Sequence, residues 1–115
     1  MILLHNPRCS KSRQALAMLE ERGCDFQTRL YLSETLSRAE LQEILGYLGM
    51  KPSELVRRGE EVFKNMHLKS ASEENILDAM VAEPKLIERP ILVVGNKAIV
   101  GRPPETVLKL MPSNG

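Results

Sequence analysis

A strand, a helix and a second strand follow one another within the first 31 residues, and this order limits the fold more than any other feature. Ile2–Leu4 is an apolar run that predicts a short buried strand, which Asn6-Pro7 ends because proline cannot donate to a strand ladder. Residues 10–22 carry apolar side chains at helical spacing, and residues 25–31 alternate between apolar and polar. Strands joined in this way are parallel, with a right-handed connection.

The middle of the chain is helical in pattern. Ser37 and Glu40 form a capping box ahead of an apolar stripe, and Gly49 ends that helix. Residues 52–58 predict a short helix that begins with proline. A further helix, capped by Ser70 or Ser72, ends before Pro84. Residues 59–68 carry no clear pattern.

Two β-type runs near the end of the chain predict a hairpin. Residues 91–94 and 97–100 are separated by Gly95-Asn96, a two-residue turn signal. Pro103-Pro104 then begins a closing helix with Val107, Leu108 and Met111 on one side. The complete order predicts an α/β fold with a mixed four-stranded sheet and helices on its faces. It is the order of a thioredoxin-like domain with a helical insertion at about 35–84, between the second and third strands.

Length and charge exclude several classes of protein. A chain of 115 residues suffices for one domain, which we expect to span 1–115. Lysine and arginine total 16 and acidic residues 15, which argues against a nucleic acid or an anionic membrane as the main partner. The two cysteines have no metal-ligand spacing, so no bound metal is predicted. The N-terminal apolar run is too short for a signal peptide or a membrane span, so we expect a cytoplasmic protein.

Cys9 is the strongest candidate for chemistry. It lies where the first strand gives way to the first helix, and unpaired N–H groups at a helix start favour an anion. Arg8, Lys11 and Arg13 add positive charge, so the thiolate is favoured and Cys9 is predicted to be a nucleophile. The alternative is a buried structural cysteine, but its polar and charged neighbours favour the nucleophile.

Three arginines stand at the boundaries of predicted elements. Arg57 ends a helix-like segment, whereas Arg89 and Arg102 flank the hairpin and should therefore lie at the same end of the sheet. Guanidinium groups bind tetrahedral oxyanions in two-pronged fashion, so an anion site beside Cys9 is one interpretation. The other is that each is a solvated surface charge. That second interpretation is the better one for other arginines of the chain, namely Arg22, Arg29, Arg38 and Arg58.

Other polar residues near Cys9 have two interpretations each. Ser12 stands three residues after Cys9, where redox motifs keep a second thiol, so its hydroxyl could donate to the thiolate or merely begin the helix. His5 could orient or help to ionise Cys9, or be satisfied by backbone groups. Cys24 lies a helix length from Cys9 and is expected to pack rather than to react. His67 receives no role.

The segment from His5 through Cys9 and Ser12 to Arg13, together with Glu88-Arg89-Pro90 and Gly101-Arg102-Pro103, resembles the glutaredoxin-linked arsenate reductase family. The resemblance spans nearly the whole chain and implies a thioredoxin-like fold. It implies that Cys9 attacks arsenate, that His5 and Ser12 support the thiolate, and that Arg57, Arg89 and Arg102 bind the oxyanion. Glutathione would then attack the adduct as a co-substrate, and glutaredoxin would complete the reduction to arsenite. Arg89-Pro90 would be a cis-proline junction, and no bound cofactor is implied.

Two other functions remain open at this stage. One is a general glutathione-dependent thiol or disulfide reductase, for which arsenate would be incidental. The other is an Spx-like regulator that binds RNA polymerase, although many of those use a CxxC switch and Ser12 argues against that route here. The oligomeric state is open as well.

Overall fold

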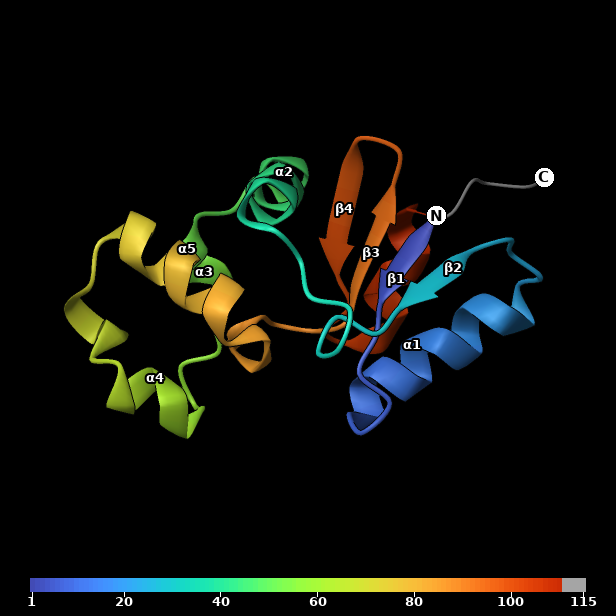
Figure 1. The fold of residues 1–115 in the computed structure, drawn as a ribbon. Coiled ribbons are helices and arrows are strands. Elements are labelled where there is room, and N and C mark those ends of the chain that lie inside the picture. Colours follow the sequence, from blue (N-terminus) through green and yellow to red (C-terminus); the bar gives the residue numbers. More distant parts are fainter. Residues whose placement is uncertain (111–115) are drawn as a thin grey trace. The chain divides into compact units, whose positions relative to one another are not determined.

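Two compact units make up the chain. The computed structural model describes residues 1–110, shown as a ribbon in Figure 1. One unit, the sheet unit, comprises Met1–Tyr31 and the chain from Arg89 onward, and the other, the helical unit, comprises Leu32–Glu88. The helical unit includes the predicted insertion at about 35–84, and the assignment of 1–115 to one domain stays a prediction.

The sheet unit contains a mixed four-stranded sheet. Its strands are β1 (Ile2–Leu4), β2 (Gln27–Arg29), β3 (Ile91–Val94) and β4 (Lys97–Val100), arranged in the order β2-β1-β3-β4 (Figure 1). The β1 and β2 strands are parallel, whereas β3 is antiparallel to both β1 and β4. The predicted mixed sheet and the parallel first pair are confirmed.

Helix α1 (Ser10–Glu21) connects the two parallel strands. Gly23 follows it with φ of 65°, the left-handed conformation with which glycine commonly ends a helix, as the sequence predicted. The β2 strand is shorter than the predicted 25–31. Its partner β1 offers only three residues for pairing, so the ladder covers Gln27–Arg29 alone.

Aliphatic side chains from α1, the central strands and the last helical segment form the core of the sheet unit. The five fully buried members, each with 0% exposure, are Leu3, Ala15, Leu19, Leu92 and Val107. Leu3 and Leu92 face one another across the β1–β3 pair. The closing segment η3 (Pro104–Leu110) is a 3₁₀ helix and buries Val107 as predicted, while Met111 lies outside the described residues.

The β3–β4 hairpin turns at Gly95-Asn96, as the sequence predicted. Gly95 has a φ of 61°, a value that glycine adopts without steric cost. At the other end, the Gly101 N–H donates to the Pro90 carbonyl at 2.8 Å. A Cβ atom on Gly101 would lie 2.8 Å from the Val107 side chain and 2.9 Å from the Pro90 ring. Only glycine therefore fits between these two side chains.

The helical unit begins with α2 (Arg38–Leu48), whose capping box of Ser37 and Glu40 is present as predicted. The other segments are α3 (Pro52–Leu55), α4 (Glu61–Asn65), η1 (Leu68–Ser70), α5 (Glu73–Ala82) and η2 (Pro84–Leu86). The predicted 52–58 helix is shorter because Val56 turns to extended backbone and pairs with Ile87. The α4 helix falls in the stretch that carried no clear pattern.

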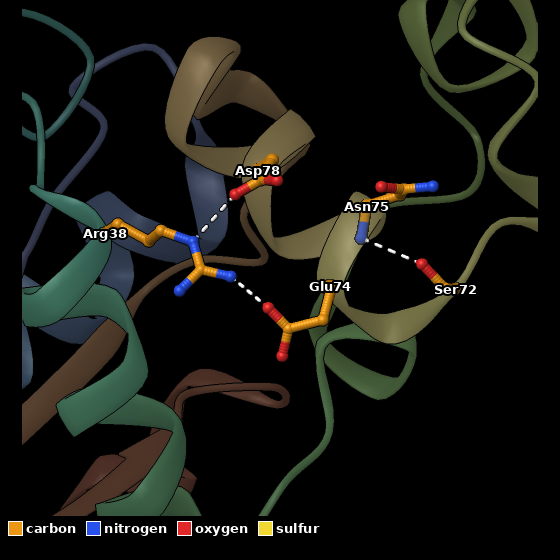
Figure 2. A network of polar contacts seen from close by, with 5 residues as sticks. All are labelled: Arg38, Ser72, Glu74, Asn75 and Asp78. Carbon is orange, nitrogen blue, oxygen red and sulfur yellow. Dashed lines mark hydrogen bonds and ion pairs between the residues drawn. The ribbon is translucent and has the colours of Figure 1, made fainter.

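Helices α2 and α5 are joined at their surface by Arg38 (Figure 2). Its Nε donates to Asp78 Oδ1 at 2.7 Å, and its Nη2 pairs with Glu74. The Arg38 side chain is 41% exposed, so water screens these ion pairs and they contribute little to the stability of the unit. Ser72 caps α5 by accepting from the Asn75 N–H at 3.2 Å.

No helix within residues 1–110 is long and apolar enough to span a membrane.

We expect Gly101→Ala to lower the free energy of unfolding by about 1–3 kcal/mol, because the added methyl group overlaps a proline ring and a β-branched side chain. Gly46→Ala is the matched control, since Gly46 lies inside α2 with no atom within 4 Å of an added Cβ. That change should raise stability by about 0.5–1 kcal/mol. Urea unfolding measures both, and equal stability of Gly101→Ala and wild type would contradict the packing described.

Candidate active site

Cys9 lies at the start of α1, as the sequence predicted. It is the N-cap of this 12-residue helix and has extended backbone angles, φ of −95° and ψ of 123°. Its N–H donates to the Asn6 carbonyl and its carbonyl accepts from the Arg13 N–H, both at 3.0 Å. Cys9 is 8% exposed, so most of this residue is shielded from bulk water.

The first turn of α1 carries no negative charge. Among the described residues that form this turn none is acidic, and the Cys9 side chain makes no capping hydrogen bond. The first N–H groups of a helix lack partners within the helix and lie at the positive end of its dipole. This end of α1 therefore offers a favourable place for a negative charge, either on the sulfur or on a bound oxyanion.

Side chains on both sides of Cys9 hold the loop between β1 and α1 in place. Asn6 Oδ1 accepts from the Arg8 N–H at 3.0 Å, and Arg13 Nη1 donates to the Pro7 carbonyl at 2.8 Å. Neither of these two hydrogen bonds was predicted from the sequence. An asparagine directly before a turn proline is the signal for the first of them, since its side chain commonly bonds the backbone two residues on.

Ser12 and His5 form a buried hydrogen-bonded pair beside this loop. The Ser12 hydroxyl oxygen lies 2.6 Å from His5 Nδ1 and accepts from the Asn6 N–H at 3.0 Å. Ser12 is 0% exposed and His5 is 6% exposed. The His5 N–H also donates to the Arg29 carbonyl at 2.9 Å, which ties the end of β1 to β2. Ser12 is thus more than a helix-start residue, because it connects the helix to the strand before it.

The environment of His5 favours its neutral form. Burial lowers the pKa of His5 below its ordinary value, and the nearby positive charge of Arg13 lowers it further. A neutral imidazole has one N–H and one accepting nitrogen. The Ser12 hydroxyl can therefore either donate to Nδ1 or accept from it.

Arg89 and Arg102 lie together at one end of the hairpin, as predicted. Arg102 Nη1 donates to the Arg89 carbonyl at 3.4 Å. The Nε and Nη1 atoms of Arg89 are buried, whereas Arg102 is exposed. The Arg89–Pro90 peptide bond is cis, as the resemblance implied, and so is Arg102–Pro103.

Arg57 belongs to the helical unit, where carboxylates hold its side chain. Its N–H donates to the Leu86 carbonyl at 2.7 Å. The guanidinium pairs with Glu60, and its Nε lies 3.7 Å from Glu88 Oε1. The side chain is 25% exposed, so Arg57 is more than an ordinary solvated charge. That Arg57, Arg89 and Arg102 surround one oxyanion at Cys9 stays a prediction.

Cys24 is partly exposed just beyond α1, and its predicted packing role stays a prediction. Within residues 1–110, no three His, Cys, Asp or Glu side chains gather where they could hold a metal ion. The expectation that the protein binds no metal and no resident cofactor likewise stays a prediction.

The sequence model of the ArsC family matches residues 4–110, a range that contains every candidate residue described above. The chain belongs to the ArsC family. This ArsC-family chain is 41% identical over 114 residues to the arsenate reductase of Haemophilus influenzae, with 96% of this chain and 98% of that protein covered. It is 46% identical over 112 residues to "Uncharacterized protein YfgD" of Escherichia coli K12, with 95% and 94% covered.

A solved structure, the arsenate reductase from Vibrio cholerae, matches the ArsC-family fold with a TM-score of 0.91. The two sequences are 41% identical, and 96% of each chain is covered. The resemblance stated from the sequence motifs is therefore confirmed. The thioredoxin-like α/β fold with its mixed four-stranded sheet is confirmed as well.

The lowered pKa of His5 predicts how stability changes with pH. The unfolded chain takes up a proton at His5 near pH 6.5, whereas the folded chain does so only at lower pH. Between these two values the unfolded state binds more protons, so stability should fall as the pH drops below about 6.5, by at most about 1.4 kcal/mol per pH unit.

Urea unfolding between about pH 7.5 and pH 5 measures this dependence in wild type and in His5→Gln. The variant should lose less stability over that range than wild type does, because it lacks the titrating group. Identical pH profiles of the two proteins would contradict the assignment to His5.

Proposed function

We propose that this ArsC-family protein is an arsenate reductase that draws its electrons from glutathione and glutaredoxin. The observation that carries the proposal is Cys9 at the N-cap of α1, in a first turn without an acidic residue. The arsenate reductases of H. influenzae and V. cholerae among its relatives support the choice of substrate. Because glutathione is abundant in a reducing compartment, we place the activity in the cytoplasm.

The first step is nucleophilic attack by the Cys9 sulfur on the arsenic of arsenate. An arsenic–sulfur bond forms, and one hydroxyl group of the protonated arsenate leaves as water after taking up a proton. The open N–H groups of α1 stabilise the thiolate before attack and the oxyanion during it. The hydrogen bonds of Asn6 and Arg13 hold the loop and so fix the position from which the sulfur attacks.

Ser12 and His5 support the thiolate in this proposal. When the His5 proton is on Nδ1, this N–H donates to the Ser12 oxygen, which leaves the Ser12 hydroxyl proton for the Cys9 sulfur. The 2.6 Å separation of Nδ1 and Oγ and the neutral state of His5 are both consistent with that arrangement. Donation to a thiolate favours the charged form of the sulfur.

Two thiols supply the electrons. Reduction of arsenate to arsenite takes up two electrons, which are available when two thiol sulfurs leave as one disulfide. Glutathione first attacks the arsenic of the Cys9 adduct and displaces a second hydroxyl group as water. A glutaredoxin thiol then attacks the glutathione sulfur, so that the two form a disulfide and arsenic stays on Cys9 as As(III). Water finally cleaves the arsenic–sulfur bond, which releases arsenite and restores the Cys9 thiol. The chain has serine at position 12, where a second thiol would otherwise resolve the adduct, so external thiols are required.

Arg89 and Arg102 are the arginines that we propose hold the oxyanion, with Arg57 as a third. Arg102 is exposed, and its Nη1 donates a long hydrogen bond of 3.4 Å to the Arg89 carbonyl, so its guanidinium lies beside Arg89 where an anion from solvent can reach it. Arg57 would have to share its guanidinium between the oxyanion and its two carboxylate partners.

Cys9→Ser should abolish arsenite production by the purified protein in the presence of arsenate, glutathione and glutaredoxin, because a serine hydroxyl stays protonated and is a weak nucleophile. Cys24→Ser, at the only other cysteine, is the control and should keep the wild-type rate. Arsenite formation that survives Cys9→Ser would refute the mechanism.

Arg102→Gln should raise the KM for arsenate by about tenfold or more, since a bidentate charged contact is replaced by a neutral one. Arg22→Gln removes the same charge from the opposite end of α1 and should leave the KM unchanged.

A parallel assay with a glutathione mixed disulfide tests whether the wild-type protein prefers arsenate or disulfides as its substrate. Efficient disulfide turnover without any arsenate turnover in wild type would identify a general thiol reductase instead.

A further inference from the structure

A cavity within the helical unit is lined by four basic side chains. It has a volume of about 380 Å³, within the range of small-molecule sites. Its lining comprises the basic residues Arg58, Lys64, His67 and Lys69, together with Phe63, Leu68 and Ser70. We call it the basic cavity. None of these residues takes part in the reductase mechanism proposed above.

Arg58 is held in a defined position at this cavity. Its guanidinium carbon lies 5.6 Å from the centre of the Phe63 ring, within the range of a cation–π contact. Its Nη2 donates to the Ser53 carbonyl at 3.2 Å. Phe63 itself is buried, with 6% exposure. Arg58 is exposed, and these two contacts place its positive charge beside the aromatic ring.

Two lysines add positive charge that the protein does not neutralise. Lys64 and Lys69 both line the basic cavity and are exposed. Neither forms an ion pair with any residue in the described range 1–110. Arg58 interacts electrostatically with Glu73, whereas the two lysines lack such a partner within the described chain, so an anion bound among the three would reduce their mutual repulsion.

His67 introduces backbone strain at the same place. Its φ is 54°, in the left-handed region, and it is the one described residue other than glycine with a positive φ. Such a conformation disfavours a residue with a Cβ and is frequent where a side chain must be aimed at a ligand. His67 and Leu68 also line an adjoining cavity of about 580 Å³, whose one charged lining residue in the described chain is Asp78. His67 therefore lines both the basic cavity and the larger adjoining cavity, whose lining is mainly uncharged.

We infer that the basic cavity binds a small organic dianion, with its negative group among Arg58, Lys64 and Lys69 and its apolar body against Phe63 and Leu68. The cations match a phosphate monoester or a dicarboxylate, which share this charge. The apolar floor favours an organic dianion over inorganic phosphate. The inference is independent of the reductase activity, because the site involves none of its residues.

Titration of ¹⁵N-labelled protein with 1-naphthyl phosphate, followed by amide chemical shifts, tests the inference. Saturable shifts should appear in residues 58–70. Inorganic phosphate supplies the charge without the apolar body, and 1-naphthol supplies the body without the charge. Each should bind at least about tenfold more weakly than 1-naphthyl phosphate. A naphthalene dicarboxylate then distinguishes the two dianion chemistries, and tight binding of either supports the site.

The double variant Lys64→Gln, Lys69→Gln should weaken 1-naphthyl phosphate binding by about tenfold or more. Lys85→Gln with Lys97→Gln removes the same charge at exposed positions that do not line the basic cavity, and should change the affinity less than twofold. Equal affinities of the two double variants would overturn the inference. Shifts confined to the first turn of α1, or no saturable shifts at all, would overturn it as well.

Discussion

A single buried hydroxyl fixes the geometry of the candidate active site. Ser12 Oγ contacts the imidazole of His5 and the backbone N–H of Asn6, so one side chain of α1 is bonded to the end of β1 and to the loop between them. A buried polar group without partners is costly, by about 1–3 kcal/mol, so this arrangement disfavours any shift of the helix start. Cys9 lies three residues before Ser12 and is held in place through it.

Around Ser12, some groups position the loop and others provide the positive charge at the start of α1. Asn6 and Arg13 bond backbone groups of the loop and therefore position it. The charge at the helix start is left to the N–H groups of α1, because no acidic side chain in the described first turn offsets it. A rigid, positively polarised end next to a sulfur is what oxyanion chemistry requires. The junction between β1 and α1 provides this positively polarised helix end.

Many boundaries of helices and strands in this fold could be predicted from the sequence, because they depend on local signals. The capping box of Ser37 and Glu40, the turn at Gly95-Asn96 and the helix end at Gly23 each have a local steric or hydrogen-bonding cause. Proline at the start of a helix is equally local, yet the 52–58 helix stops at Leu55. There the pairing of Val56 with Ile87, a contact between distant parts of the chain, overrides the local preference.

Contacts between distant residues account for most of what could not be predicted. The contact of Arg102 with Arg89 followed from the hairpin, but the contact of Arg57 with Glu88 did not, because tertiary pairing brings Glu88 there. The basic cavity was missed for the same reason. Lys64 and Lys69 look like ordinary surface charges in the sequence, and the left-handed backbone of His67 gives no compositional signal.

The hairpin that carries Arg89 and Arg102 also determines which insertions the family can accept. Both arginines lie at the open end of the β3–β4 ladder, whereas the Gly95-Asn96 turn lies at the closed end. Extra residues in that turn leave the pairing of Ile91 with Val100 unchanged, so Arg89 and Arg102 stay at the same end of the ladder. One extra residue inside either strand moves the side chains beyond it to the other face of the sheet and so disturbs the pairing at that end. Variation in length among relatives is therefore expected at the turn and not along the strands.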